Sequence, residues 1–270
     1  RITDRGKMNI LIRGGGDLGS GVAFRLHRVG WNVVVTEIPK PLVLRRSVSF
    51  ANAIYEKEVM VEGITSRHIE DPREIAATLE NRIIPVLISP DKYEFDGYKP
   101  DVVIDARLLK KFVDYSLKTT PMVIGLGPGF ETGKNCHVVI ETNRGHYLGR
   151  AIWSGSPMED TGTPGTVKDK SQERVLRAPK SGVINNGREL GSIMKKGEVI
   201  GYVDEEPVLT PFDGCLRGLM HDGITVEKGL KIGDLDPRID KNLIYFISEK
   251  ALAIAGGVLE AIMTYQTIKK

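Results

Sequence analysis

Cysteine, long apolar runs and an excess of one charge are all missing from this sequence, and each absence excludes a class of protein. Cys136 and Cys215 are its two cysteines, which are too few for a disulfide framework. Neither stands in a Cys-x-x-Cys or Cys/His cluster, so we predict no metal site. No apolar run reaches the roughly 18 residues that are needed to cross a bilayer.

The charges nearly cancel, because 38 lysines and arginines stand against 35 aspartates and glutamates, for a net charge of +3. This balance speaks against binding of nucleic acid or of a membrane through bulk positive charge. Residues 1–7 are polar and no signal-peptide core follows them, so Met8 is the expected start of the natural chain. We therefore predict a cytoplasmic protein without a nucleic-acid or membrane partner.

The length of 270 residues suits about two domains with a core that needs no disulfide or metal. We predict an α/β fold class, in which a Rossmann-like parallel sheet domain is joined to an all-β barrel-sandwich hybrid module with an internal 32-residue repeat. The expected parts are the Rossmann-like domain at 8–130, a β-hairpin and linker region at 131–172, the β module at 173–238, and a C-terminal helix that packs back on the α/β part at 239–270.

The first 125 residues alternate strand-like and helix-like segments, which predicts a parallel sheet with helices on its faces. Helical spacing of apolar residues follows the glycine run at 14–16 and stops at Gly30. A second helix is expected to open at Asp71, where a capping residue precedes Pro72, and to end near Arg82. Short apolar strands are expected at 9–12, 32–38, 84–89, 101–105 and 122–124.

The segments after residue 125 show a different sequence pattern. Strand-like residues 138–142 and 147–153 flank the turn Asn143-Arg144-Gly145, which predicts a hairpin. Glycine, threonine and proline at 161–165 and a polar stretch to Gln172 predict a linker. The last segment, 248–270, is expected to be a helix whose apolar stripe contains Leu252, Ala255, Leu259, Ile262 and Met263.

An internal repeat lies between the linker and this helix. Eight residues recur unchanged at one offset of 32 positions, namely Pro179, Gly182, Gly191, Lys196, Gly197, Ile200, Gly201 and Asp204, which return as Pro211, Gly214, Gly223, Lys228, Gly229, Ile232, Gly233 and Asp236. Each copy has short strands and turns and is too small to bury an apolar face alone. The repeat therefore predicts two similar β halves that fold against each other.

The first candidate site is the run Gly14-x-Gly16-x-x-Gly19, which follows a strand and opens a helix. In dinucleotide-binding folds such glycines permit a tight turn, close approach of a diphosphate and close helix packing. Glu37 ends the next strand, where a carboxylate would accept ribose hydroxyls. We predict cofactor binding at Gly14, Gly16, Asp17, Gly19 and Glu37, and the alternative is a turn kept for packing alone.

Charged residues near this loop qualify the prediction. Asp17 lies inside the loop, where its carboxylate would repel a phosphate. Arg45 and Arg46 follow shortly after Glu37 and could compensate, or could hold a 2′-phosphate. The alternative for the two arginines is a charged helix start. Because of the first possibility, we include Arg45 among the cofactor-binding candidates.

A second glycine-rich loop contributes Gly125, Gly127 and Gly129 at the carboxyl end of a predicted strand. Ligands bind at that edge of open α/β sheets, and glycine-spaced amides can form an anion nest. The alternative is a sharp turn between domains. Arg144, on the hairpin turn, is a further candidate for the same pocket, although a solvated hairpin tip is the commoner explanation for such a group.

Catalytic residues are not identified by any pattern in the sequence. Glu141 and His146 flank the hairpin turn and could serve as acid and base. Cys136 and His137 are adjacent, so a strand would point them to opposite faces, which speaks against a joint metal or nucleophile site. The remaining histidines have no partners at ligand spacing and are expected to be surface or helix residues: His27, His68 and His221.

The repeat resembles biotinyl and lipoyl carrier domains in the phrases GSIMKKGEVIGYV and GITVEKGLKIGDLD. In those carriers a lysine on the hairpin between the halves takes the cofactor. The corresponding place here reads Asp204-Glu205-Glu206-Pro207 and has no lysine. The resemblance therefore implies a structural or docking version of the module, without biotin or lipoate.

Over nearly its full length the chain resembles the YqeB-type accessory family of selenium-dependent molybdenum hydroxylase systems. The matching phrases are IRGGGDLGSGVAFRLHRVG (12–30), PLVLRRSVSFANAI (41–54), IGLGPGF (124–130), VIETNRGHYLGR (139–150), DTGTPG (160–165) and KIGDLDPR (231–238). The resemblance implies a maturation protein for a xanthine-dehydrogenase-like enzyme, with that hydroxylase or its cofactor-assembly proteins as partners. The expected ligand is an NAD-like dinucleotide or a molybdopterin-type cofactor, held by Gly14, Gly16, Gly19 and Glu37.

Three hypotheses follow. The favoured one is an accessory protein that binds such a cofactor through the two glycine loops and Arg144. The second is an NAD-dependent oxidoreductase of a small molecule, with Glu141 or His146 as acid or base. The third is a docking protein with an empty Rossmann site. Assembly into a homo-oligomer is compatible with all three.

Overall fold

A computed structural model describes residues 7–92, 94–113, 115, 117, 121–159 and 172–268. The chain divides into two compact units. The first unit consists of Arg1–Pro41, Phe50–Asp160 and Ile247–Lys270, and the second of Leu42–Ser49 and Thr161–Phe246. The expected linear order of parts thus becomes an interleaved one, in which the chain enters the second unit twice.

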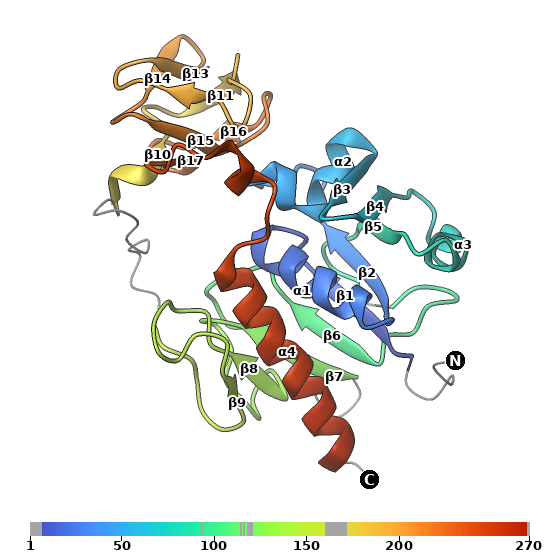
Figure 1. Ribbon diagram of the computed structural model, residues 1–270. Helices are drawn as coiled ribbons and strands as arrows, with labels where there is room; N and C mark the ends of the chain where they lie inside the picture. Colours follow the sequence, from blue (N-terminus) through green and yellow to red (C-terminus); the bar gives the residue numbers. More distant parts are fainter. Residues whose placement is uncertain are drawn as a thin grey trace. The chain divides into compact units, whose positions relative to one another are not determined.

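The first unit is built on one nine-stranded sheet, in the order β3-β4-β5-β2-β1-β6-β7-β8-β9 (Figure 1). Neighbouring strands from β4 to β8 are parallel, whereas the edge pairs β3–β4 and β8–β9 are antiparallel. The strands are β1 (Asn9–Arg13), β2 (Asn32–Glu37), β3 (Glu58–Val61), β4 (Ile64–His68), β5 (Ile84–Ile88), β6 (Val102–Asp105), β7 (Met122–Leu126), β8 (Val138–Ile140) and β9 (Ala151–Ile152).

Two helices lie side by side along this sheet, α1 (Asp17–Arg28) and α4 (Glu249–Ile268) (Figure 1). Small residues permit the close packing, since a Cβ on Gly21 of α1 would lie 2.7 Å from the Cβ of Ala251 on α4. Two shorter helices, α2 (Ala53–Glu56) and α3 (Ile75–Glu80), complete the helices of the described residues. A capping box between Asp71 and Glu74 opens the 3₁₀ turn that leads into α3.

One core cluster is covered largely by irregular segments. Leu11, Val34 and Val103 from the sheet pack in it with aromatic side chains of segments that lie between strands, namely Tyr98, Tyr115 and Phe130. No helix occupies the described residues between β5 and β6, between β6 and β7 or between β7 and β8. Buried aromatic rings thus supply apolar area that crossover helices would otherwise provide.

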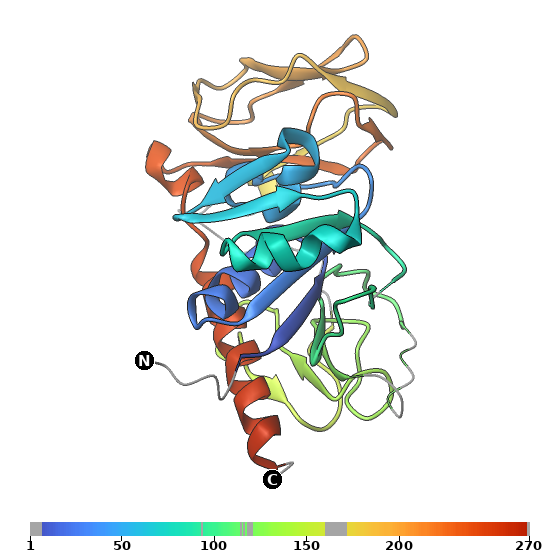
Figure 2. The same ribbon diagram turned by 90° about the vertical axis from the view of Figure 1, so that its right-hand side faces the viewer.

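The second unit has two four-stranded antiparallel sheets, ordered β10-β17-β15-β12 and β14-β13-β11-β16, which Figure 2 shows as two layers. The strands are β10 (Val175–Arg177), β11 (Gly182–Asn185), β12 (Ile193–Met194), β13 (Val199–Val203), β14 (Glu206–Leu209), β15 (Gly214–Leu219), β16 (Thr225–Val226) and β17 (Lys231–Asp236). The repeat copies exchange their short strands, since β12 of the first copy pairs with β15 and β16 of the second copy pairs with β11.

Repeat glycines occupy equivalent turns in the two copies. Gly197 and Gly229 have φ angles of +85° and +82°, in the left-handed region that glycine adopts without a Cβ clash. The Gly197 N–H donates to Thr210 at 2.9 Å and the Gly229 N–H to Ala178 at 2.8 Å. Because residues 178 and 210 are themselves 32 positions apart, the hydrogen bonds follow the repeat.

The predicted fold class is therefore wrong. The structure has a large mixed sheet and two separate antiparallel sheets, with four α-helices in the described residues, and not a Rossmann-like parallel sheet with a barrel-sandwich hybrid module. The sheet differs from the predicted one because its edge strands are antiparallel and because several connections between its parallel strands have no helix in the described residues. Residues 58–68, where no element was expected, form the β3–β4 hairpin.

Candidate functional site

The carboxyl ends of the parallel strands bring three charged residues to one edge of the first unit, and one of them, Glu37, was predicted from the sequence. Arg13 ends β1, Glu37 ends β2 and Asp105 ends β6. The chain leaves β1 toward β2 on one side, while β6 lies on the other side of β1. In open α/β sheets ligands bind at such a reversal of strand order, so this edge is the candidate site.

The first glycine loop forms a tight turn at this edge. Gly14 has a φ of +97°, and its N–H donates to the Thr36 carbonyl at 2.8 Å. A Cβ on Gly14 would lie 3.0 Å from the backbone of Ala106, and one on Gly19 would collide with the Gly14 carbonyl. Both glycines are thus required by close backbone packing.

Glu37 binds the loop itself. Its Oε1 accepts the Gly15 N–H and its Oε2 accepts the Ile38 N–H, each at 2.9 Å. Burial raises the pKa of the Glu37 carboxyl, and these two hydrogen bonds partly offset the shift. The carboxylate has lone pairs left to accept a ligand hydroxyl, but its described role is to hold the loop.

The segment that contains Ala51 covers part of the same loop. The Ala51 N–H donates to the Gly15 carbonyl at 3.0 Å, and the Ser20 hydroxyl donates to that carbonyl at 2.8 Å. Gly14 and Gly15 are buried in consequence, whereas Gly16 and Asp17 keep partial exposure where α1 begins. A ligand would therefore meet the loop at Gly16 and Asp17, beside the N-terminal end of the helix.

A cavity of about 580 Å³ opens at the same edge, beside the ends of β4 and β5. The Ser89 N–H on its wall donates to the Glu37 carbonyl at 3.0 Å, so cavity and glycine loop are joined through Glu37. Its lining combines apolar Ile69, Leu87 and Phe95 with polar residues, among them His68, Glu70, Ser89, Asp91 and Lys92. This volume lies in the range of small-molecule sites.

A buried charged cluster follows on the other side of the loop. Arg107 donates to Asp105 through Nε at 3.0 Å and through Nη2 at 2.6 Å. The Tyr115 hydroxyl donates to Asp105 at 2.8 Å and accepts from Arg13 Nη1 at 2.7 Å. Burial and the Asp105 charge raise the pKa of Tyr115. No sequence motif pointed to this cluster, although Arg13 and Asp105 are charged residues that directly end apolar strands.

The second glycine loop is filled by protein atoms. A Cβ on Gly125 would enter the Phe130 ring, and one on Gly127 would meet the Thr142 hydroxyl. The Gly127 N–H donates to the Ile140 carbonyl at 3.0 Å. A Cβ on Gly129, whose φ is +100°, would lie 2.6 Å from the Lys111 carbonyl. Packing thus accounts for Gly125, Gly127 and Gly129.

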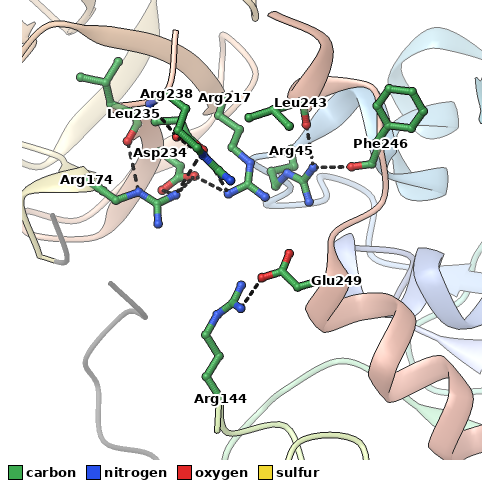
Figure 3. A network of polar contacts seen from close by, with 11 residues as sticks. Arg45, Arg144, Arg174, Arg217, Asp234, Leu235, Arg238, Leu243, Phe246 and Glu249 are labelled. Carbon is green, nitrogen blue, oxygen red and sulfur yellow. Dashed lines mark hydrogen bonds and ion pairs between the residues drawn. The ribbon is translucent and has the colours of Figure 1, made fainter. Parts of the chain in front are cut away.

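The hairpin residues do not converge on the glycine loops. Arg144 forms an ion pair with Glu249 at the start of α4 (Figure 3). Glu141 is buried, and its oxygens accept the Asn143 N–H at 2.7 Å and the Met158 N–H at 2.8 Å. His146 is exposed and lies edge-on to Tyr147. No contact of Glu141 or His146 in the described structure favours an acid–base role.

Arg45 belongs to the second unit. Its Nη2 donates to the carbonyls of Leu243 at 3.4 Å and Phe246 at 2.7 Å (Figure 3). Arg46 donates to Nδ1 of His221 at 3.2 Å, and burial with the Arg46 charge lowers the pKa of His221 to about 4. The two arginines therefore hold residues 42–49 in the second unit.

Metal and thiol chemistry find little support in the described residues, among which no group of three histidine, cysteine or acidic side chains could hold a metal ion. Cys136 is buried, and burial raises the pKa of its thiol to about 11. His27 bonds the Arg82 carbonyl at 3.0 Å, and His68 lines the cavity.

Among the described residues, no helix is long and apolar enough to cross a membrane.

Comparison with solved structures gives weak alignments. An aspartoacylase family protein from Mesorhizobium loti aligns with a TM-score of 0.28 and 10% identity, over 85% of each chain. A succinylglutamate desuccinylase/aspartoacylase from Rhodobacter sphaeroides aligns with a TM-score of 0.26 and 13% identity, over 87% of each chain. TM-scores this low support no argument about function.

Comparison of sequences is more informative. Models of known protein families give no match. The Escherichia coli (strain K12) protein named "Uncharacterized protein YqeB" is 44% identical over 258 residues, which are 96% of this chain and 48% of that protein. The chain spans about half the length of this curated relative. This chain is thus similar to that protein along nearly the whole of its own 270 residues.

Proposed function

We propose that the chain is a cofactor-binding accessory protein, whose ligand is an NAD-like dinucleotide or a molybdopterin-type cofactor. The supporting observation is the continuity of the carboxyl edge, where the cavity, Glu37 and the partly exposed start of α1 at Gly16 follow one another. A diphosphate-bearing ligand has groups that suit each part: a ring system for the cavity, hydroxyls for a carboxylate and an anion for a helix N-terminus.

The residues at this edge offer the types of contact that such a ligand requires. Ile69, Leu87 and Phe95 offer apolar contact for a ring, and Glu37 retains acceptor capacity for a hydroxyl. The backbone at Gly16 presents no side chain to a diphosphate, and the first N–H groups of α1 have no partner within the helix. A bound dinucleotide would supply hydride chemistry, and a molybdopterin-type cofactor would supply metal-binding dithiolene chemistry.

The biological role is part of the same proposal. The YqeB-type phrases at 12–30, 124–130 and 139–150 support a maturation function for a selenium-dependent molybdenum hydroxylase. The partners would then be the hydroxylase or its cofactor-assembly proteins, and the compartment the cytoplasm. Copurification of a hydroxylase with the tagged chain from cells would support this role, and a chain recovered alone under the same conditions would contradict it.

The binding proposal has a direct test. Mass spectrometry of small molecules released from the purified chain identifies the ligand class, and calorimetric titration with NAD⁺ measures binding. Gly16 has φ −69° and ψ −170°, a conformation that any residue adopts, so Gly16→Val should fold. Its side chain would meet a diphosphate, so we expect at least a tenfold loss of affinity.

A matched control is available in α4, where a Cβ on Gly256 would meet nothing within 4 Å. Gly256→Ala should bind NAD⁺ as the wild type does. Unchanged affinity in Gly16→Val, or no dinucleotide or pterin in the released material together with no NAD⁺ binding, would overturn the proposal.

A further inference from the structure

The buried cluster at the ends of β1 and β6 has more positive than negative charge. Arg13 and Asp105 are direct neighbours in the parallel register of these strands, so both lie on one face of the sheet. Arg13 is 5% exposed and Asp105 is 1% exposed. Arg107 binds the Asp105 carboxylate directly, and Arg13 is linked to it through the Tyr115 hydroxyl, so these four residues carry a net charge of +1.

The partners of Arg13 are neutral. Its Nη1 donates to the Tyr115 hydroxyl at 2.7 Å and its Nη2 to the Pro90 carbonyl at 2.5 Å. Its Nε is buried and makes no hydrogen bond with the described part of the chain. Burial of a cation is costly unless an anion lies near it, and Asp105 is already bound by Arg107 and Tyr115.

Arg107 connects this buried charge to the solvent. Its side chain is 20% exposed, and Asp105 fixes it through Nε and Nη2. A Cβ on Gly14 would lie 3.0 Å from the Arg107 backbone nitrogen, so Arg107 begins its loop directly beside the first glycine turn. A planar guanidinium held in this way is suited to an oxyanion, because its fork geometry matches carboxylate and phosphate groups.

We infer that Arg13, Asp105, Arg107 and Tyr115 form an oxyanion-binding subsite, which takes a phosphate or carboxylate group of a ligand at the carboxyl edge. Arg107 contacts the oxyanion, and Arg13 supplies the second positive charge from below the surface. Asp105 and Tyr115 are positioning residues, since they orient the two guanidinium groups. The inference rests on the proposed function only in that both place a ligand at this edge.

The test uses the full chain and simple anions as probes. Calorimetric titration with sodium phosphate and, separately, with sodium acetate distinguishes the two oxyanion sources. We expect saturable binding of at least one of them. Arg107→Met keeps the aliphatic stem and removes the charge, so affinity should fall at least tenfold, while Arg107→Lys should recover part of it.

A second variant separates positioning from charge. Tyr115→Phe removes the hydroxyl that links Arg13 to Asp105 and leaves all charges in place, so we expect a threefold to tenfold loss of affinity. The matched control is Arg67→Met, which removes an exposed arginine of β4 that pairs with Glu58. It should bind the anion as the wild type does. Circular dichroism verifies that each variant is folded.

Several outcomes would overturn the inference: no saturable binding of either anion, unchanged affinity in folded Arg107→Met, or an equal loss in Arg67→Met. If Arg107→Met does not fold, Arg107→Lys and Tyr115→Phe decide the question. Gly16→Val separates this subsite from the proposed cofactor site. Loss of NAD⁺ binding with retained anion binding supports both sites as distinct, whereas anion binding without any NAD⁺ binding contradicts only the proposed cofactor.

Discussion

At the scale of single residues, buried charged and polar side chains in this chain mostly hold backbone. Glu37 binds the N–H groups of Gly15 and Ile38, Glu141 binds those of Asn143 and Met158, and Arg45 binds two carbonyls. Each of these side chains supplies hydrogen bonds to backbone groups that lose their water on burial. The Asp105 cluster differs, because Asp105 binds the Arg107 guanidinium and the Tyr115 hydroxyl, and Arg107 keeps contact with solvent.

His221 gives a prediction at this scale. Arg46 can only donate, so Nδ1 of His221 must accept and the imidazole must be neutral. The pKa of His221 is about 4 in the folded chain against 6.5 in the unfolded chain, so the unfolded state binds more protons between these values. The free energy of unfolding should therefore fall as the pH falls from 6.5 to 4.

The measurement is urea unfolding at pH 7, 5.5 and 4.5. In His221→Gln the amide oxygen can still accept from Arg46 but cannot titrate, so the variant should lose less stability over this range than the wild type. The control His146→Gln removes an exposed histidine and should behave as the wild type. An identical pH dependence in His221→Gln and the wild type would contradict the assignment.

At the scale of elements, the close packing of α4 against neighbouring backbone decides which of its faces is buried. Of the predicted stripe of α4, Ala255 and Ile262 are buried as expected, whereas Met263 is 57% exposed and Leu252 and Leu259 are only partly buried. The structure instead buries Ala251, Gly257 and Ala261. These small residues let α4 lie against α1 and against the chain at Gly149, which larger side chains would prevent.

Two adjacent glycines of α4 provide a matched test of this packing. A Cβ on Gly257 would collide with the Gly149 carbonyl, whereas one on Gly256 would meet nothing within 4 Å. Gly257→Ala should destabilise the chain by about 1–3 kcal/mol, as overpacking does. Gly256→Ala should stabilise it by about 0.5–1 kcal/mol, through lower backbone entropy of the unfolded chain. Equal effects in urea unfolding would refute the packing argument.

At the scale of the whole molecule, the chain passes between the two units four times. Residues 42–49 belong to the second unit although their neighbours in sequence belong to the first. The Leu219 N–H donates to the Leu44 carbonyl at 2.9 Å, and the Ser47 hydroxyl donates to the Ile244 carbonyl at 2.6 Å. The second unit thus requires a segment that lies more than 100 residues before its main part.

Arg45 tests this organisation. Arg45→Met leaves the carbonyls of Leu243 and Phe246 without their donor, so we expect a loss of about 1–3 kcal/mol in the free energy of unfolding. Arg188→Met, which removes an exposed arginine of the same unit, is the control and should keep the stability of the wild type. Unchanged stability in Arg45→Met would contradict this role of Arg45.

Local pattern was sufficient where a segment's own residues determine its conformation. The strands at 9–13, 32–37 and 84–88, the helix after the glycine run and the capping box at Asp71 follow from apolar runs, caps and glycines. The repeat offset predicted equivalent turns, because Gly197 and Gly229 need the same left-handed φ. Each of these features depends on neighbours in sequence or on backbone freedom alone.

Tertiary structure alone decided the rest. The antiparallel edge strands, the helix-free crossovers, the place of 42–49 and the meeting of Arg13, Asp105, Arg107 and Tyr115 depend on pairings between residues far apart in the chain. Such pairings depend on which surfaces remain to be buried once the local elements have formed, and no local pattern contains that information. The sequence by itself therefore determined where the glycine turn after β1 lies, and the fold determined which charged residues lie beside it.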